Sequence, residues 1–283
     1  AAGDGSNATG AISTALGNFA TTFGTAAAAV GQSANAFGAY SFAGGQGAAA
    51  VAYAGIAIGQ GSVAGASSAE TYDIAIGPQA VAKAPGGGSA MAVGAGATAN
   101  AGGAASFGTA VGQYTLAQGN FTTVVGRDAK AIQDNSTAIG FAANASGYAS
   151  YAGASGAAAA GDYGVALGPG ATAGRPGFAA TDSGVIAIGN SANASLQGAV
   201  ALGQLACATG VYATALGRSA IATGQTSIAS GFQSNANGIS AIAIGSSAFG
   251  NGNATTAVGN GAVALVAGAS AFGNSANASG GQS

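Results

Sequence analysis

Glycine recurs at every seventh residue through much of this chain, and that spacing constrains the fold more than any other feature. From Gly112 to Gly280 the seven-residue lattice has 25 positions, and Gly occupies 19 of them. The chain has 54 Gly in 283 residues, so chance would fill about five. A fixed short period of this kind is typical of stacked structural repeats.

The lattice changes phase in four places. The steps from Gly59 to Gly77, from Gly77 to Gly94 and from Gly94 to Gly112 each exceed two lattice units by three or four residues. We therefore expect insertions near 60–76, 78–93 and 95–111. Within 169–188 the apolar half of the repeat slips by one lattice unit.

A seven-residue period could indicate a coiled coil, but a Gly in each turn opposes a helix and the charged flanks are missing. The residues before each lattice Gly alternate in size, as in Ile186-Ala187-Ile188-Gly189. Alternation with period two predicts a short strand with one apolar face. We expect Gly to supply the backbone freedom at each corner between strands.

The residues that precede the lattice glycines alternate between two kinds, which doubles the repeat to two lattice units. Leu202 and Ile244 precede Gly203 and Gly245, whereas Thr209 and Asn237 precede the glycines that lie between such positions. One 14-residue coil therefore has two unlike strands, and about 20 coils stack as an all-β, parallel β-solenoid. We expect the larger side chains before the glycines to fill a thin core, with Cys207 in an equivalent slot: Ile186, Ile188, Val200, Leu202, Ile242, Ile244 and Cys207.

The amino-acid composition argues against several kinds of protein. Only 4% of residues are charged, against roughly 25% in an ordinary soluble domain, and the net charge is −2. High apolar content argues against disorder, and the lack of a basic surface argues against nucleic acid. Because Gly interrupts every apolar stretch, no membrane-spanning run is expected. The flat Ala-rich faces predict a homo-oligomer, cyclic by default.

The sequence also argues against an enzyme. It contains no His, and its seven acidic residues are scattered, so no acid–base pair is evident. The Gly-rich segments lack the Gly-Lys-Ser/Thr of a phosphate-binding loop. We expect no catalytic residues, no metal site and no cofactor.

Several repeat units resemble a known family. The segments Ser136-Thr137-Ala138-Ile139-Gly140 and Ala241-Ile242-Ala243-Ile244-Gly245 are similar to the YadA-like head repeats of trimeric autotransporter adhesins. The resemblance implies that residues 1–283 form a single continuous left-handed parallel β-roll and that three chains pack side by side as a homotrimer. It also implies display on the outer membrane of a Gram-negative bacterium, through an anchor outside this sequence.

Ligand contacts are expected where the lattice breaks, because loops that leave a regular wall carry variable functions. Charged residues stand near these breaks: Glu70, Lys83, Arg175 and Asp182. Exposed tyrosines are a second set of candidates, since Tyr anchors protein and sugar surfaces. Tyr148, Tyr151 and Tyr163 share one Ala/Gly-rich stretch, although they could instead cover an irregular coil.

We therefore expect a non-enzymatic adhesin head that attaches to host matrix protein, a host cell or an abiotic surface through many weak contacts. An ice-binding β-solenoid is an alternative, but it requires Thr-x-Thr ranks, whereas Thr pairs such as Thr122-Thr123 are adjacent in this sequence. An inert spacer in a surface fibre is a third possibility. The ligand's identity cannot be read from these residues.

Overall fold

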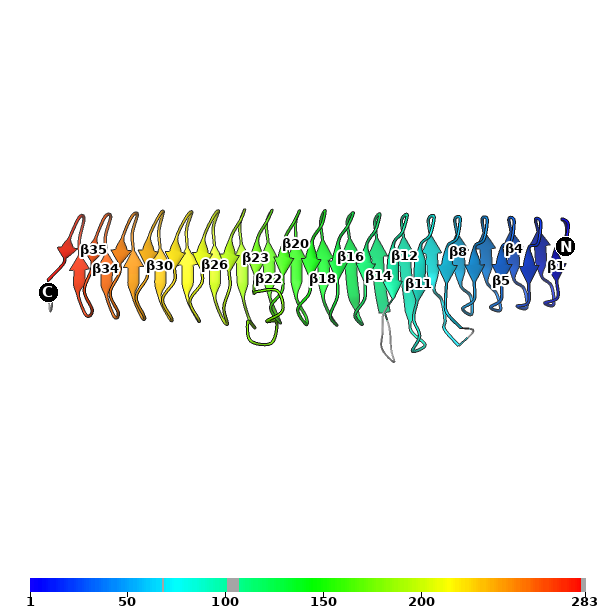
Figure 1. Ribbon diagram of the computed structural model, residues 1–283, viewed down its shortest axis with the longest axis horizontal. Helices are drawn as coiled ribbons and strands as arrows, with labels where there is room; N and C mark the ends of the chain where they lie inside the picture. Colours follow the sequence, from blue (N-terminus) through cyan, green and yellow to red (C-terminus); the bar gives the residue numbers. More distant parts are fainter. Residues whose placement is uncertain (68, 101–106, 281–283) are drawn as a thin grey trace. The chain divides into compact units, whose positions relative to one another are not determined.

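The computed structural model describes residues 1–67, 69–100 and 107–280. The chain divides into two compact units, Ala1–Ala143 and Asn144–Ser283. Within each unit the chain winds as a succession of coils, each contributing one strand to each of two parallel sheets (Figure 1). The two units have the same construction, and each is described by itself.

Even-numbered strands, mostly three residues long, form sheet A of each unit. In the first unit they are β2 (Thr14–Leu16), β4 (Ala28–Val30), β6 (Phe42–Gly44), β8 (Ile56–Ile58), β10 (Ile74–Ile76), β12 (Ser89–Val93), β14 (Phe107–Val111), β16 (Thr122–Val125) and β18 (Thr137–Ile139). In the second they are β20 (Tyr151–Gly153), β22 (Val165–Leu167), β24 (Ile186–Ile188), β26 (Val200–Leu202), β28 (Thr214–Leu216), β30 (Ile228–Ser230), β32 (Ile242–Ile244), β34 (Thr256–Val258) and β36 (Ser270–Phe272).

Odd-numbered strands, mostly two residues long, form sheet B of each unit. In the first unit they are β1 (Asn7–Ala8), β3 (Thr21–Thr22), β5 (Asn35–Ala36), β7 (Ala49–Ala50), β9 (Val63–Ala64), β11 (Val81–Lys83), β13 (Thr98–Asn100), β15 (Leu116–Ala117) and β17 (Lys130–Ala131). In the second they are β19 (Asn144–Ala145), β21 (Ala158–Ala159), β23 (Thr172–Ala173), β25 (Asn193–Ala194), β27 (Cys207–Ala208), β29 (Ile221–Ala222), β31 (Asn235–Ala236), β33 (Phe249–Gly250), β35 (Val263–Ala264) and β37 (Asn277–Ala278).

Strand pairing confirms the parallel solenoid with ~14-residue coils. Thr14 pairs with Ala28 in sheet A of the first unit, and Ile186 pairs with Val200 in sheet A of the second. In both pairs the partners stand one regular coil apart and the strands are parallel. The stacked strands thus satisfy one another's backbone groups, which compensates for the low strand propensity of Ala and Gly.

The core is built from alanine, and the predicted core was therefore wrong. Along β24 the fully buried residue is Ala187, whereas Ile186 is only partly buried and Ile188 is 37% exposed. The same holds for the other predicted core residues, which are partly buried or exposed on outer faces: Val200, Leu202, Ile242, Ile244 and Cys207. Successive side chains of a strand point to opposite faces. The alternation therefore predicted the strands correctly, but the Ala face is inside and the face with the larger side chains is outside.

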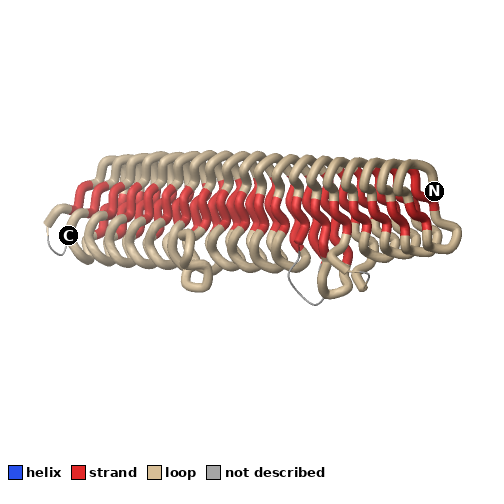
Figure 2. Tube along the Cα trace, turned by 45° about the vertical axis from the view of Figure 1, so that its right-hand side comes forward, coloured by secondary structure: helices blue, strands red, loops and turns tan. Residues whose placement is uncertain are grey.

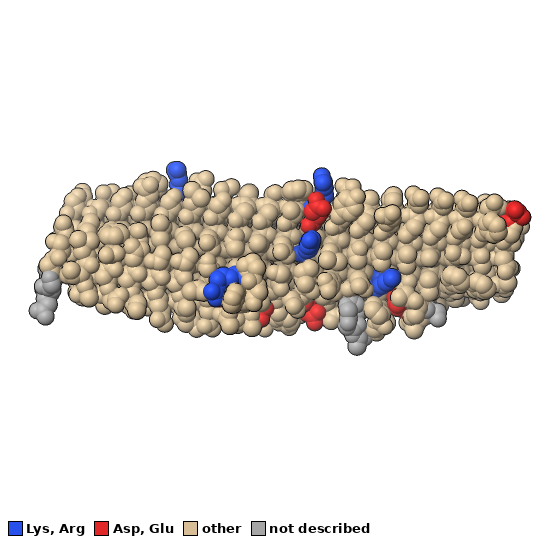
Figure 3. Space-filling view, viewed as in Figure 1, with Lys and Arg blue, Asp and Glu red and all other residues tan. Residues whose placement is uncertain are grey.

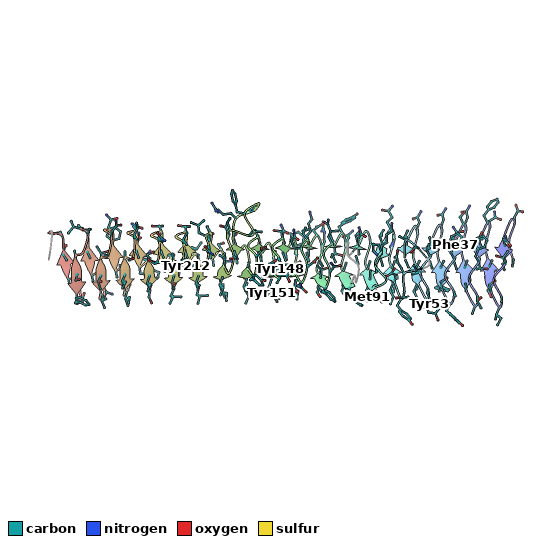
Figure 4. All side chains as sticks on the ribbon, turned by 90° about the horizontal axis from the view of Figure 1, so that it is seen from below. Phe37, Tyr53, Met91, Tyr148, Tyr151 and Tyr212 are labelled. Atoms are coloured by element: carbon teal, nitrogen blue, oxygen red, sulfur yellow. The ribbon has the colours of Figure 1, made fainter. Side chains whose placement is uncertain are left out.

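Short corners explain why only small side chains fit inside. Each connection from a sheet-A strand to the next sheet-B strand of its unit has four residues, such as Gly189-Asn190-Ser191-Ala192 between β24 and β25. In Figure 2 tan connections run along both edges of the red strands, and the four-residue connections make up one of these edges. Two sheets joined so tightly lie close together, and a methyl group fills the space between them. The bulky side chains consequently stand outside the coils (Figure 4).

Glycine serves two different purposes at the corners. After sheet-A strands it adopts a left-handed backbone, with φ of +133° at Gly189, a conformation that costs other residues energy. Gly65 and Gly174, which begin two of the longer connections after sheet-B strands, also have positive φ, +87° and +82°. After the sheet-B strands of regular coils the φ of the lattice Gly is not left-handed. There, as at Gly24, a Cβ atom would overlap the backbone of the next coil. The seven-residue lattice in the sequence is therefore two superimposed 14-residue patterns.

Four coils are longer than the others. In the first unit Ile56 pairs with Ile74, Ile74 with Met91, and Met91 with Thr109, so each of these coils exceeds the regular length by three or four residues. In the second unit Val165 pairs with Ile186, which makes that coil longer by one full lattice unit. The extra residues lie between a sheet-B strand and the next sheet-A strand: in the connection 65–73, in the longer strands β11 and β12 on either side of the connection 84–88, in the connection 101–106 and in the connection 174–185. The third connection lies outside the described residues.

Candidate functional site

Among the described residues, the extra residues of the longer coils all lie on one side of the coil, between a sheet-B strand and the next sheet-A strand. We use the name insertion edge for the connections that lead from a sheet-B strand to the next sheet-A strand within each unit. The other connections, from sheet A to sheet B, keep four residues throughout both units. Variation in length is therefore confined to one edge, and an edge that tolerates different loops is the natural place for specific contacts.

Two of the three predicted tyrosines meet on the insertion edge. Tyr148 and Tyr163 lie in successive coils, with ring centroids 5.5 Å apart and an interplanar angle of 77°. Their side chains are 40% and 61% exposed. Tyr151 lies apart from them, in β20, where it points to the outer face of sheet A and is partly buried. Tyr148, Tyr151 and Tyr212 are labelled in Figure 4.

A second group of tyrosines on this edge escaped the sequence analysis. Tyr40, Tyr53 and Tyr72 occupy successive coils of the first unit, with ring centroids 5.5 Å and then 6.0 Å apart, each pair edge to face. With Tyr212, six of the chain's eight tyrosines lie on the insertion edge. Most of them follow a lattice position of the polar half by one or two residues, and that spacing could have identified them.

The longest described insertion, 174–185, is held by an ion pair. The Arg175 guanidinium donates from Nε to Asp182 Oδ2 at 2.9 Å and from a terminal nitrogen to Asp182 Oδ1 at 3.0 Å. Its Cζ also lies 4.4 Å from the centre of the Phe178 ring. Burial by itself would raise the pKa of Asp182, but the hydrogen bonds and charge of Arg175 lower that pKa below its ordinary value.

The predicted contact residues of the first two insertions are differently placed. Glu70 is buried at 1% exposure and accepts hydrogen bonds from the Ala66 and Ala84 amides at 2.9 and 3.1 Å. Lys83 is partly buried at the end of β11. Glu70 and Asp182 are thus corrected as ligand contacts, because both carboxylates are buried and satisfied by groups of their own chain. Arg175 stays accessible, with 45% of its side chain exposed.

The described residues contain few features of a reactive centre. They contain no pocket and no group of three or more His, Cys, Asp or Glu that could hold a metal ion. Cys207 is a free thiol on the outer face of sheet B, and partial burial raises its pKa. Charged side chains are sparse on the face in Figure 3. Among the residues described, no helix has the length and apolar character needed to cross a membrane.

The described units therefore define a class of protein: a parallel β-solenoid with ~14-residue coils and an alanine core. A family model, the YadA head domain repeat, matches residues 117–143, 131–152, 186–206, 208–234 and 222–248. Over these segments the chain matches the YadA head repeat, the family that its repeat units resemble. Comparison with curated proteins finds no significant match.

The family indicates a coarse function. YadA-like heads suggest an adhesin-like role, trimeric association and display on a bacterial cell surface. This family and this fold are typically non-enzymatic. Which surfaces of this chain make which contacts depends on its own side chains.

Proposed function

We propose that this chain is the head of a trimeric autotransporter adhesin, a non-enzymatic module that attaches a Gram-negative bacterium to host matrix protein, host cells or abiotic surfaces. In this proposal two further copies pack beside it, and each chain winds as a left-handed β-roll. One continuous head, 1–283, would carry the insertions on its exposed edge. The observation that carries the proposal is the separation of an apolar face from a variable, tyrosine-bearing edge.

The outer face of sheet A is the surface best suited to contact the other copies. In the second unit its outward positions are largely Val, Leu and Ile, as in the neighbouring strands β22, β24 and β26. Leu167, Ile188 and Ile244 are 41%, 37% and 42% exposed. A contiguous apolar surface of this kind marks an interaction site. Cyclic packing of identical chains would bury it.

The insertion edge is the surface best suited to contact a ligand. Its tyrosines combine an apolar ring with a hydroxyl group, which suits protein and sugar surfaces alike. Two of its acidic residues, Asp134 and Asp162, each accept a backbone N–H from the preceding coil, from Asn120 and Tyr148 at 2.8 Å. Low charge favours neutral, hydrogen-bonded contact. Three copies of one edge would multiply weak contacts into avidity.

The experiment is a binding assay of the purified head on matrix proteins, cells and plastic. A variant with Tyr40, Tyr53 and Tyr72 replaced by Ser should bind weakly. Tyr114→Ser is the matched control, because Tyr114 is exposed at 56% on the opposite edge. Equal binding by both variants would overturn the role of the edge, and a head that binds nothing would be a spacer.

For the ice-binding alternative, three threonines do stack on successive coils of sheet A, Thr109, Thr123 and Thr137, but the second outward position of the same strands carries Val111, Val125 or Ile139, so no Thr-x-Thr rank is formed there. On the outer face of sheet B, Thr21 is followed along its column by Asn35 and then Ala49. A rank of Thr on successive coils is what an ice-binding wall would need, and this column does not supply one.

A further inference from the structure

Two carboxyl groups lie together in the first insertion, buried from solvent. Asp73 is 0% exposed and Glu70, the sole glutamate of the chain, is 1% exposed. Asp73 stands directly before β10, at a position that Ser or Ala occupies in most other coils. A charge in this alanine core is costly unless it is paired or neutralised.

Their hydrogen bonds indicate a shared proton. Asp73 Oδ1 accepts the Ala90 amide at 2.7 Å, whereas Asp73 Oδ2 is buried and has no donor among the described residues. Asp73 and Glu70 are close enough for a hydrogen bond between their side chains. A carboxyl proton would satisfy Asp73 Oδ2 by donating to Glu70, and it would remove the repulsion between two negative charges.

The pair connects two insertions. Glu70 accepts hydrogen bonds from the amide of Ala66, in its own connection, and from the amide of Ala84, which begins the second insertion. Asp73 accepts the amide of Ala90, just beyond that insertion. The Ser89 hydroxyl adds a bond to the Thr71 carbonyl oxygen at 3.1 Å. The connections 65–73 and 84–88 are therefore held by the two carboxyl groups.

We propose that Glu70 and Asp73 form a pH-sensitive latch, which holds the first two insertions against the solenoid while they share a proton and releases them when that proton is lost. The latch proposal concerns only the conformation of the insertion edge, so it does not depend on the adhesive function proposed above.

The electrostatics place the transition near neutrality. Burial, together with the hydrogen bond and negative charge of Glu70, raises the pKa of Asp73 to about 7 against the favourable Ala90 amide. Among the charged groups described, Glu70 alone acts on Asp73. Lys83 precedes Ala84 but is partly exposed at the end of β11, and Tyr53 and Tyr72, on the adjoining connections, are exposed.

Limited trypsin digestion tests the latch, because the native sequence has a trypsin cleavage site next to the second insertion. The bond between Lys83 and Ala84 is a trypsin site that opens only if the second insertion leaves the solenoid, whereas Arg218 lies on a regular corner of the second unit. The ratio of cutting at Lys83 to cutting at Arg218 cancels the pH dependence of the protease. For a group that titrates near pH 7, this ratio should rise about tenfold between pH 6 and pH 8.

Substitutions separate the latch from a general loosening. Asp73→Asn keeps the shape without the titration, so its ratio should stay flat with pH. Glu70→Gln removes the neighbouring charge and so lowers the pKa of Asp73, and the rise should then be complete at a lower pH. Asp134→Asn, a corner substitution elsewhere in the first unit, should leave the wild-type curve unchanged. A flat wild-type ratio, or an undiminished rise in Asp73→Asn, would overturn the proposal.

If Asp73→Asn fails to fold, the proposal is tested by the pH shift of the cutting ratio in Glu70→Gln alone. A rise that keeps its wild-type midpoint in that variant counts against the latch.

Discussion

Gly224 lies directly against Gly238 of the next coil, so closely that a Cβ atom on Gly224 would overlap the Gly238 carbonyl oxygen. We expect Gly224→Ala to lower the free energy of unfolding by about 3 kcal/mol or more, because neither backbone can move aside. Gly177→Ala is the control. Its Cβ would meet nothing within 4 Å, although its φ is +84°, so it should cost about 1–2 kcal/mol. Denaturant unfolding measures both, and equal costs would contradict the explanation.

The alanine core can be tested within a single strand. Ala159 is fully buried in β21, and its neighbour Ala158 points outward. Ala159→Leu should overfill the space between the sheets and cost about 3 kcal/mol. Ala158→Leu should cost less than about 0.5 kcal/mol, as surface substitutions usually do. Thermal and denaturant unfolding would show the difference, and the reverse order would restore the core originally expected from the sequence.

The proposed trimer face can be tested with two matched substitutions, one on each sheet. Ile244 is outward on sheet A, and Ile221 is outward on sheet B. Ile244→Asp should convert trimer to monomer in analytical ultracentrifugation while circular dichroism stays that of a β-solenoid, because a buried unpaired charge opposes association. Ile221→Asp should leave the trimer intact. A wild-type chain that sediments as a monomer would refute the assembly itself.

The ion pair of the fourth insertion predicts sensitivity to acid. The pKa of Asp182 is lowered in the folded loop, so its ionised form stabilises the loop. That stabilisation is complete above the ordinary Asp pKa of 3.8 and is lost as the pH falls below it. Amide exchange of residues 174–185, corrected for intrinsic rates, should accelerate several-fold between pH 6 and pH 3.

Asp182→Asn supplies the control for this loop. The variant should exchange rapidly at both pH values, because the amide cannot replace the carboxylate opposite Arg175. Exchange in the variant that matches the wild type at pH 6 would show that the ion pair does not hold the insertion.

Asp73 of the first insertion has its pKa raised rather than lowered, so its effect on stability has the opposite sign. Its protonated form belongs to the folded state, so the stability it confers is lost as the pH rises toward 7. The chain thus carries two loops with opposite pH responses, one on the insertion edge of each unit.

Some properties could be read from the residues because each depends on local geometry. The Gly lattice predicted the coil length, since a left-handed corner and a close backbone approach both favour a residue without a Cβ atom. The alternation of Ile186, Ala187 and Ile188 predicted a strand, since side chains of a strand alternate between faces. The repeat units predicted the YadA-like family.

Which face of each strand is inside was decided by the tertiary structure. A pattern with period two is symmetric between its faces, and the larger residue is inside only where the sheets stand far enough apart. Here four-residue corners bring them close, so Ala187 is buried and Ile188 faces outward. Likewise, residues 40, 53 and 72 are irregularly spaced in the sequence, and only stacking of the coils lines them up. Local sequence thus determined the coil, while the distance between the two sheets and the order of stacking determined its core and its exposed edge.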